Sequence, residues 1–127
     1  MSTFIVIFVV HFLADFVFQS SKMATGKSKS FTWLCIHVGT YAIVSLLSFG
    51  FITYYYGDAL FAFYWWLVNV ILHFIVDFIT SKITSKFWDQ KNMRLFFVMI
   101  GFDQLIHTLC LISTFLVVKD IILLRSF

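Results

Sequence analysis

The sequence predicts an all-α protein, a polytopic membrane domain with four transmembrane helices in a compact bundle. Composition is the first reason, because 61% of the 127 residues are hydrophobic and 12% are charged, against about 45–50% and about 25% in soluble domains. The aromatic content is the second, since a water-soluble fold of this length could not bury 18 Phe, 5 Tyr and 4 Trp. These features exclude a soluble globular domain, a disordered chain and a coiled coil.

Four apolar runs supply the predicted helices, because each comes close to the about 20 residues that cross about 30 Å of hydrocarbon. The expected spans, all within one domain over residues 1–127, are roughly 3–20, 31–56, 59–80 and 95–118. The chain has no proline, so we expect unbroken helices. The first run has no basic start and contains His11 and Asp15, so we expect it to stay in the mature protein.

The other three runs have features of their own. The second has an edge of small residues that favours close helix packing, namely Gly39, Ala42, Ser45 and Ser48. The third is followed by two copies of Thr-Ser-Lys that put Lys82 and Lys86 on one helical face. We interpret these lysines first as positive-inside anchors, and the alternative is a helix that continues toward the lipid headgroups. The second and fourth runs contain Cys35 and Cys110, which we interpret as reduced packing residues.

The distribution of positive charge predicts the topology. Seven of the nine Lys and Arg residues lie in the first and third loops, whereas the loop around Gly57 and Asp58 has none. Basic residues favour cytoplasmic loops, so the first and third loops are expected in the cytoplasm and both termini outside. Topology thus accounts for the net charge of +3, and no nucleic-acid partner is implied.

Ionisable residues within the spans are the main functional signal. The four histidines, His11, His37, His73 and His107, fall one in each predicted helix, and Asp15, Asp77 and Asp103 lie in three of these helices. An aspartate at the centre of a spanning helix costs about 2.5–3.5 kcal/mol on the insertion scale. Each Asp is four residues from a His, and residues four apart share a helical face. We expect one polar seam on each helix.

These seams predict one shared metal site, because all seven residues fall between the cytoplasmic interface and roughly the midplane. Imidazole and carboxylate ligands suit zinc, manganese or iron. The predicted ligands of a divalent metal are His11, Asp15, His37, His73, Asp77, Asp103 and His107. The candidate catalytic residues are Asp77, Asp103 and Tyr41, and the candidate substrate-binding residues are Gln19, Lys22, Lys82 and Gln104.

A metal site in the cytoplasmic half of the membrane, next to the basic loops, favours a metal-dependent hydrolase that acts on a membrane lipid or lipid-linked phosphate. Two other interpretations stay open. The His and Asp residues could pair across helices as polar contacts worth about 0.6–2 kcal/mol each, or they could relay protons or ions. Four short helices suit a transporter poorly unless the chain forms a homo-oligomer.

The motif order resembles a known family. A His-Phe-Leu/Ile-x-Asp-Phe pattern begins at His11 and again at His73, which suggests two hairpins related by a pseudo-twofold axis along the membrane normal. With HFLADFVFQSSK at 11–22, the His37 helix, HFIVDFITSK at 73–82 and FDQLIH at 102–107, the chain resembles the small bacterial and phage membrane proteins of domain of unknown function 3307.

This resemblance implies a compact bundle in a bacterial inner membrane. It also implies a recurring polar set, His11, Asp15, Gln19, His37, His73, Asp77, Lys82, Asp103, Gln104 and His107. A looser resemblance connects the chain with inner-membrane proteins regarded as metal-dependent hydrolases. Phage members of the family imply an alternative, an envelope effector that binds a host membrane protein and uses its polar core only as scaffold.

Overall fold

The computed structural model describes residues 2–125 and is helical, with no strand in that range. The elements are α1 (Ser2–Phe12), the π-helix η1 (Leu13–Val17), α2 (Ser21–Gly26), α3 (Phe31–Tyr56), α4 (Ala59–Asp89) and α5 (Met93–Arg125). The predicted all-α bundle is confirmed.

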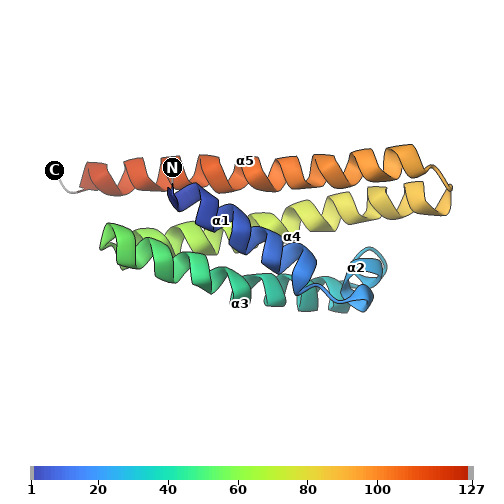
Figure 1. The fold of residues 1–127 in the computed structure, drawn as a ribbon, viewed down its shortest axis with the longest axis horizontal. Helices are drawn as coiled ribbons and strands as arrows, with labels where there is room; N and C mark the ends of the chain where they lie inside the picture. Colours follow the sequence, from blue (N-terminus) through green and yellow to red (C-terminus); the bar gives the residue numbers. More distant parts are fainter. Residues whose placement is uncertain (1, 126–127) are drawn as a thin grey trace.

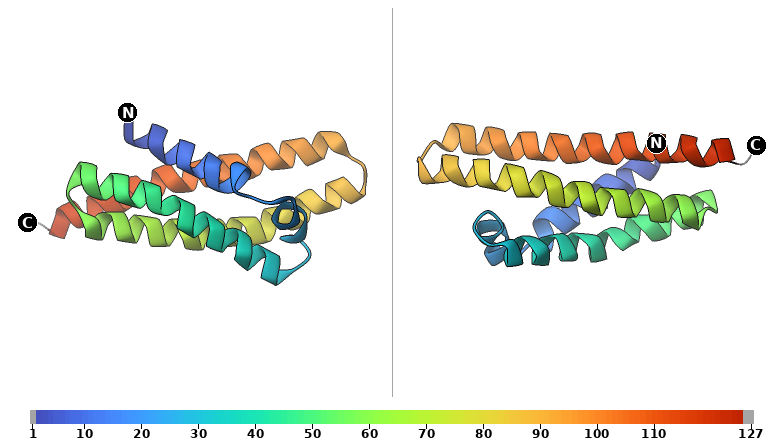
Figure 2. Two further views of the ribbon diagram at one scale, coloured as in Figure 1. Left: turned by 60° about the horizontal axis from the view of Figure 1, so that its bottom comes forward. Right: turned by 180° about the vertical axis from the view of Figure 1, so that it is seen from behind.

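The long helices α3, α4 and α5 form an antiparallel layer, and α1 lies across it. In this layer α4 is central and packs along both α3 and α5, while α1 crosses obliquely and contacts α3 and α5 (Figure 1). Figure 2 shows the same crossing from two further sides. The α3–α4 turn lies at one end of the bundle, and α2 and the α4–α5 turn lie at the other. The two basic segments, residues 22–29 and 82–94, therefore share one end, which we call the basic end, although most of the second segment is helical and not the predicted loop.

The helices differ in length from the predicted spans. Three helices are long and apolar enough to cross a membrane, α3, α4 and residues Met93–Ile122 of α5, whereas the first apolar helix covers only Thr3–Val17. It ends three residues before the predicted boundary because Ser20 adopts an extended backbone and accepts a hydrogen bond from the Met23 N–H at 3.3 Å, which starts α2. The α4 helix continues to Asp89, nine residues beyond the predicted boundary at residue 80, so the Thr-Ser-Lys repeat belongs to the helix.

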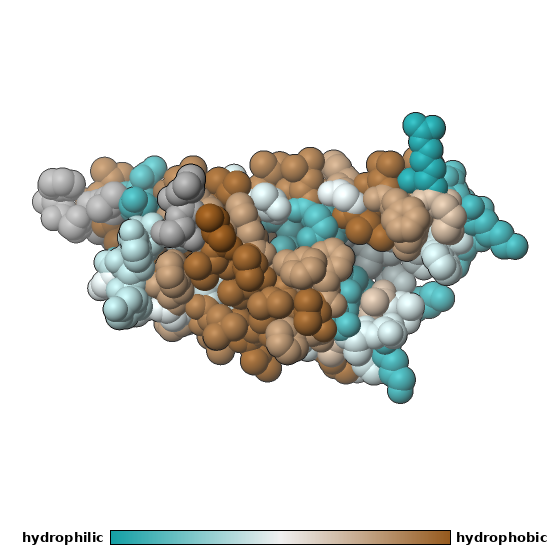
Figure 3. Space-filling view, in the orientation of Figure 1, coloured by the Kyte–Doolittle hydropathy of each residue, from teal (hydrophilic) through white to brown (hydrophobic). Residues whose placement is uncertain are grey.

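The apolar core fills the half of the bundle away from the basic end. The helices α1, α3, α4 and α5 all contribute to it, with Ile7, Ile52, Phe61, Ala62, Trp65, Leu111 and Phe115. The Trp65 Nε1–H donates to the Leu111 carbonyl at 3.2 Å, so the one polar atom of this large side chain is satisfied. Hydrophobic residues also cover most of the outer face in Figure 3, while hydrophilic residues gather at the basic end.

Loop 1 (residues 18–30) folds back onto the bundle at the basic end. A Cβ placed on Gly26 would lie 2.8 Å from the Trp33 ring, so the glycine lets the end of α2 lie directly against α3. Lys27 follows as the C-terminal cap of α2 and is half-buried. This close packing positions Lys27 above the polar side chains of the bundle.

Candidate metal centre

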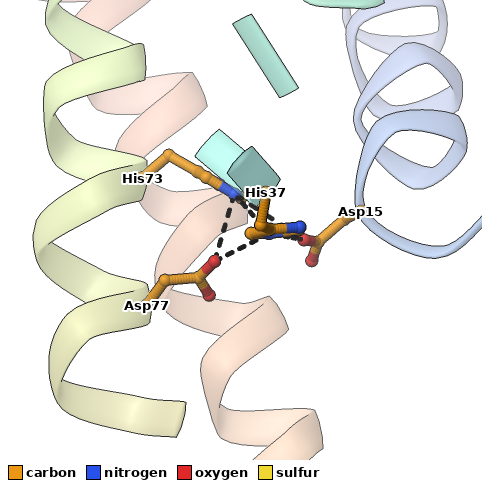
Figure 4. A group of neighbouring side chains, drawn as sticks. All are labelled: Asp15, His37, His73 and Asp77. Carbon is orange, nitrogen blue, oxygen red and sulfur yellow. Dashed lines mark hydrogen bonds and ion pairs between the residues drawn. The ribbon is translucent and has the colours of Figure 1, made fainter. Parts of the chain in front are cut away.

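Four side chains from three separate segments meet in the interior. Asp15 comes from η1, His37 from α3, and His73 and Asp77 from α4 (Figure 4). None is more than 3% exposed. One ligand atom from each lies within 4.8 Å of the other three.

The His37 Nε2 is at the middle of this group. It lies 2.8 Å from Asp77 Oδ2, 3.1 Å from Asp15 Oδ1 and 3.1 Å from His73 Nε2. The His73 Nε2 lies 3.4 Å from Asp77 Oδ2 and 3.7 Å from Asp15 Oδ1. The four donor atoms therefore lie close enough together to bind one ion.

These separations suit a single tetrahedral ion. Ligands about 2.0–2.1 Å from zinc in a tetrahedron are about 3.3 Å apart, and the five separations above range from 2.8 to 3.7 Å. Two imidazoles and two carboxylates are also a donor set that zinc, manganese and iron accept. Asp15, His37, His73 and Asp77 therefore fit one divalent transition metal, and we call them the primary site.

The π-helix explains how Asp15 joins the primary site. In α4 the i,i+4 pair His73 and Asp77 lies 3.4 Å apart, whereas the His11 Nε2 is 4.0 Å from Asp15 Oδ2. The extra residue in the π-helical turn, closed by the Phe18 N–H donating to the Leu13 carbonyl at 2.8 Å, turns the Asp15 carboxylate toward α3. Single π-helical turns often occur at functional sites. The two copies of the repeated motif thus have different backbones.

A second group of ligands adjoins the primary site and shares Asp15. Asp15, Asp103 and His107 each place one ligand atom within 4.8 Å of the others. The His107 Nε2 lies 3.6 Å from oxygens of both Asp77 and Asp103. His11 belongs to neither group in the described part of the chain, and its Nε2 lies 3.3 Å from Gln104 Oε1.

Amide and hydroxyl groups orient the carboxylates. The Gln104 Nε2 donates to Asp15 Oδ2 and, at 3.1 Å, to Asp103 Oδ2. The Thr80 hydroxyl donates to Asp103 Oδ1. Such partners of ligands fix their orientation and typically matter 10–100-fold for metal affinity.

Lys27 is the residue that the sequence analysis did not select. Its Nζ donates to both carboxylate oxygens of Asp77 at 3.1 Å, and its side chain is 13% exposed. The sequence analysis counted Lys27 only among the basic loop residues. No periodicity identifies it, because it lies outside the long helices and reaches Asp77 only through the packing of α2.

A cavity of about 430 Å³ connects these residues with the basic end. Asp15, Asp77 and Asp103 line its inner part, together with Lys27 and Gln104. Its outer part is lined by Thr84, Ser85 and Trp88 near the end of α4 and by Phe96 near the start of α5. The primary site is therefore reachable from the side of the basic loops.

The remaining predicted catalytic and substrate-binding residues do not all lie at the site. Tyr41 stacks on the His73 ring at 3.7 Å between centroids, so it holds that imidazole in place. Gln19 lines the cavity, and its Oε1 is buried without a partner among the described residues. Lys22 is exposed on α2, outside the residues that line the cavity. Lys82 is also exposed, with its Nζ 3.6 Å from the Phe78 ring centroid.

Comparison with known proteins decides the family. A family model described as "Protein of unknown function (DUF3307)" matches residues 3–125. The chain belongs to this family. No curated protein and no solved structure matches the chain. The DUF3307 match covers α1 through α5, so it includes every residue of both ligand groups.

Proposed function

We propose that this DUF3307 protein is a metal-dependent hydrolase that cleaves a phosphate ester of a lipid or lipid-linked carrier within a bacterial inner membrane. The observation that carries the proposal is the primary site, in which two histidines and two aspartates converge and both aspartates line a cavity. A bound divalent ion would supply Lewis-acid polarisation of the phosphoryl group and activation of water.

Once a metal is bound, the charges in the cavity balance, so they no longer repel an anionic substrate. Asp15, Asp77 and Asp103 supply three carboxylates, which a divalent cation and the Lys27 ammonium balance. Lys27 is within reach of both Asp77 and the cavity. Its Nζ can therefore turn from Asp77 to a phosphoryl oxygen and stabilise the charge that develops there. Asp103, held by Thr80 and Gln104, is the candidate for accepting a proton from water.

The walls of the cavity suit a lipid more than a soluble phosphate. Apolar side chains, including Phe16, Trp88, Phe96 and Ile100, line it beside the polar groups. A smaller cavity of about 180 Å³ adjoins it and is lined by Lys27, Lys29 and Lys82 together with Phe31 and Phe78. Cationic groups above apolar walls match a phosphate headgroup attached to an acyl or polyprenyl chain.

The orientation that we propose follows the positive-inside rule. Seven of the nine basic residues lie in loop 1, in the α4–α5 turn or on the adjoining ends of α4 and α5, and these segments share one end of the bundle. Basic residues at a membrane boundary favour the cytoplasm. The cavity would then open toward the cytoplasmic leaflet, with both termini outside.

Proton or ion translocation is the weaker alternative. It would require a polar path through the whole bundle. In the described residues the polar side chains give way to the apolar core around Trp65 and Phe115, which are 2% and 3% exposed. A proton or ion path that starts at the basic end would therefore stop at this apolar core. A reaction site needs an opening at one end only.

The direct test is phosphate release from lipid. We expect the purified protein in vesicles with a lipid phosphomonoester or a polyprenyl pyrophosphate to release inorganic phosphate when zinc, manganese or iron is supplied, and to stop when a chelator is added. Unchanged lipids under every metal would overturn the hydrolase proposal. Vesicles with the same metals and no protein are the control.

Lys27→Gln is expected to lower kcat/KM for this reaction about 100-fold, the usual cost of losing one group that stabilises transition-state charge. Lys27 is a hydrogen-bond partner of Asp77 and not itself a member of the primary site, so its loss can also weaken metal binding, and the variants are compared at saturating metal with their metal content measured. Lys86→Gln is the matched control, because Lys86 is exposed on α4 and does not line the cavity. Equal activity of the two variants would remove Lys27 from the mechanism.

A further inference from the structure

We propose a second divalent cation site, built from Asp15, Asp103 and His107, whose ion shares the Asp15 carboxylate with the ion of the primary site. This inference rests on the proposed function, because the second ion needs the primary site as its neighbour. The protein would then hold two neighbouring divalent ions that together bind a phosphate monoester.

The geometry of the second group is the first observation. One ligand atom from each of its three residues lies within 4.8 Å of the other two. They come from η1 and from successive turns of α5. Two protein carboxylates and one imidazole would leave coordination positions open, as expected for an ion that also binds substrate.

The second observation is that the buried His107 Nε2 makes no hydrogen bond within the described residues. The residue is 3% exposed. The same atom lies 3.6 Å from one oxygen of Asp77 and 3.6 Å from one oxygen of Asp103, too far for a hydrogen bond. The His107 Nε2 thus lies at ion-pair distance from two carboxylates and makes a hydrogen bond to neither, which is the position of a metal ligand.

The fixed orientation of Asp103 is the third observation. Both of its carboxylate oxygens accept hydrogen bonds, one from the Thr80 hydroxyl and one from the Gln104 amide. Gln104 also donates to Asp15, so one side chain holds both carboxylates of the second group. Ligands of metal ions are typically oriented by partners of this kind.

The charge balance indicates which substrate a paired centre would take. The three carboxylates are balanced by Lys27 and one divalent cation. A second divalent cation adds two positive charges, which a phosphate monoester dianion neutralises. Two ions that share a carboxylate can hold the attacking and leaving oxygens of a phosphoryl group together.

The test is a manganese titration of the purified protein in detergent with inorganic phosphate present. We expect about two ions per chain, as in other two-metal sites, and an electron paramagnetic resonance spectrum of two exchange-coupled ions. In His107→Phe we expect one ion per chain and the hyperfine-split spectrum of an isolated ion. Thr114→Val, an isosteric change on the same face of α5, is the control and should behave as wild type.

The outcomes separate this inference from the proposed function. One isolated ion per wild-type chain would overturn the second site and leave a hydrolase with one metal. No bound ion in wild type would overturn both proposals. The coupled spectrum is measured on the wild-type protein, so the test does not depend on the folding of the variant.

Discussion

Asp77→Asn is expected to weaken transition-metal binding by more than about 100-fold, because losing a direct ligand should exceed the 10–100-fold cost of losing a ligand's partner. Asp77 Oδ2 lies 2.8 Å from His37 Nε2 and 3.4 Å from His73 Nε2. The substitution keeps the shape of the side chain and removes its negative charge. Plasma mass spectrometry on the detergent-purified protein, after metal is supplied and excess is removed, measures the effect.

Asn69→Ala is the matched control for this variant. Asn69 lies eight residues before Asp77 on α4, is 4% exposed, and donates to the Trp65 carbonyl and to Thr114 Oγ1 at 2.8 Å. It is thus a buried polar residue on the same helix and outside both ligand groups. Wild-type metal content in Asn69→Ala together with its loss in Asp77→Asn would assign the metal to the primary site.

The same variant, expressed in the host, addresses the envelope-effector alternative. An effector that acts through surface contact should keep its effect on the host in Asp77→Asn, because Asp77 is fully buried. If the protein acts instead as a metal-dependent enzyme, the Asp77→Asn variant should have no effect on the host. Wild-type metal binding by Asp77→Asn would contradict the primary site and return the His and Asp residues to a purely structural role.

Phe115→Ala is expected to lower the free energy of unfolding by about 3 kcal/mol. This is the lower end of the range for Phe→Ala in soluble cores, because lipid is as apolar as the core and only the lost packing counts. The Phe115 ring lies 5.0 Å from that of Phe61 and 5.2 Å from that of Phe4, so its removal leaves a void between three helices. Unfolding by sodium dodecyl sulfate in mixed micelles measures the change.

Phe97→Ala is the control, because the same residue type on the same helix is 65% exposed there. Its removal leaves no internal void, and we expect a change within about 0.5 kcal/mol, as for surface substitutions. Equal destabilisation by the two variants would mean that the apolar cluster around Trp65 is not the core that holds α1, α3, α4 and α5 together.

The sequence alone determined the helical class, the segments that form the long helices, and most of the residues that meet in the candidate metal centre. Hydrophobic runs of sufficient length and a spacing of four residues are properties of the chain itself, and they place His73 beside Asp77 and Asp103 beside His107 without any tertiary contact. Six of the seven predicted ligands accordingly fall into the two groups.

The tertiary structure decided which of these ligands belong to each of the two groups and which other residues lie beside them. The π-helical turn at Asp15 depends on an extra residue in one turn, which helical periodicity does not encode, and it directs this carboxylate to His37 in place of His11. Lys27 reaches Asp77 because Gly26 packs against Trp33. Contacts between segments far apart in the chain have no local signal, and so only the folded bundle shows them.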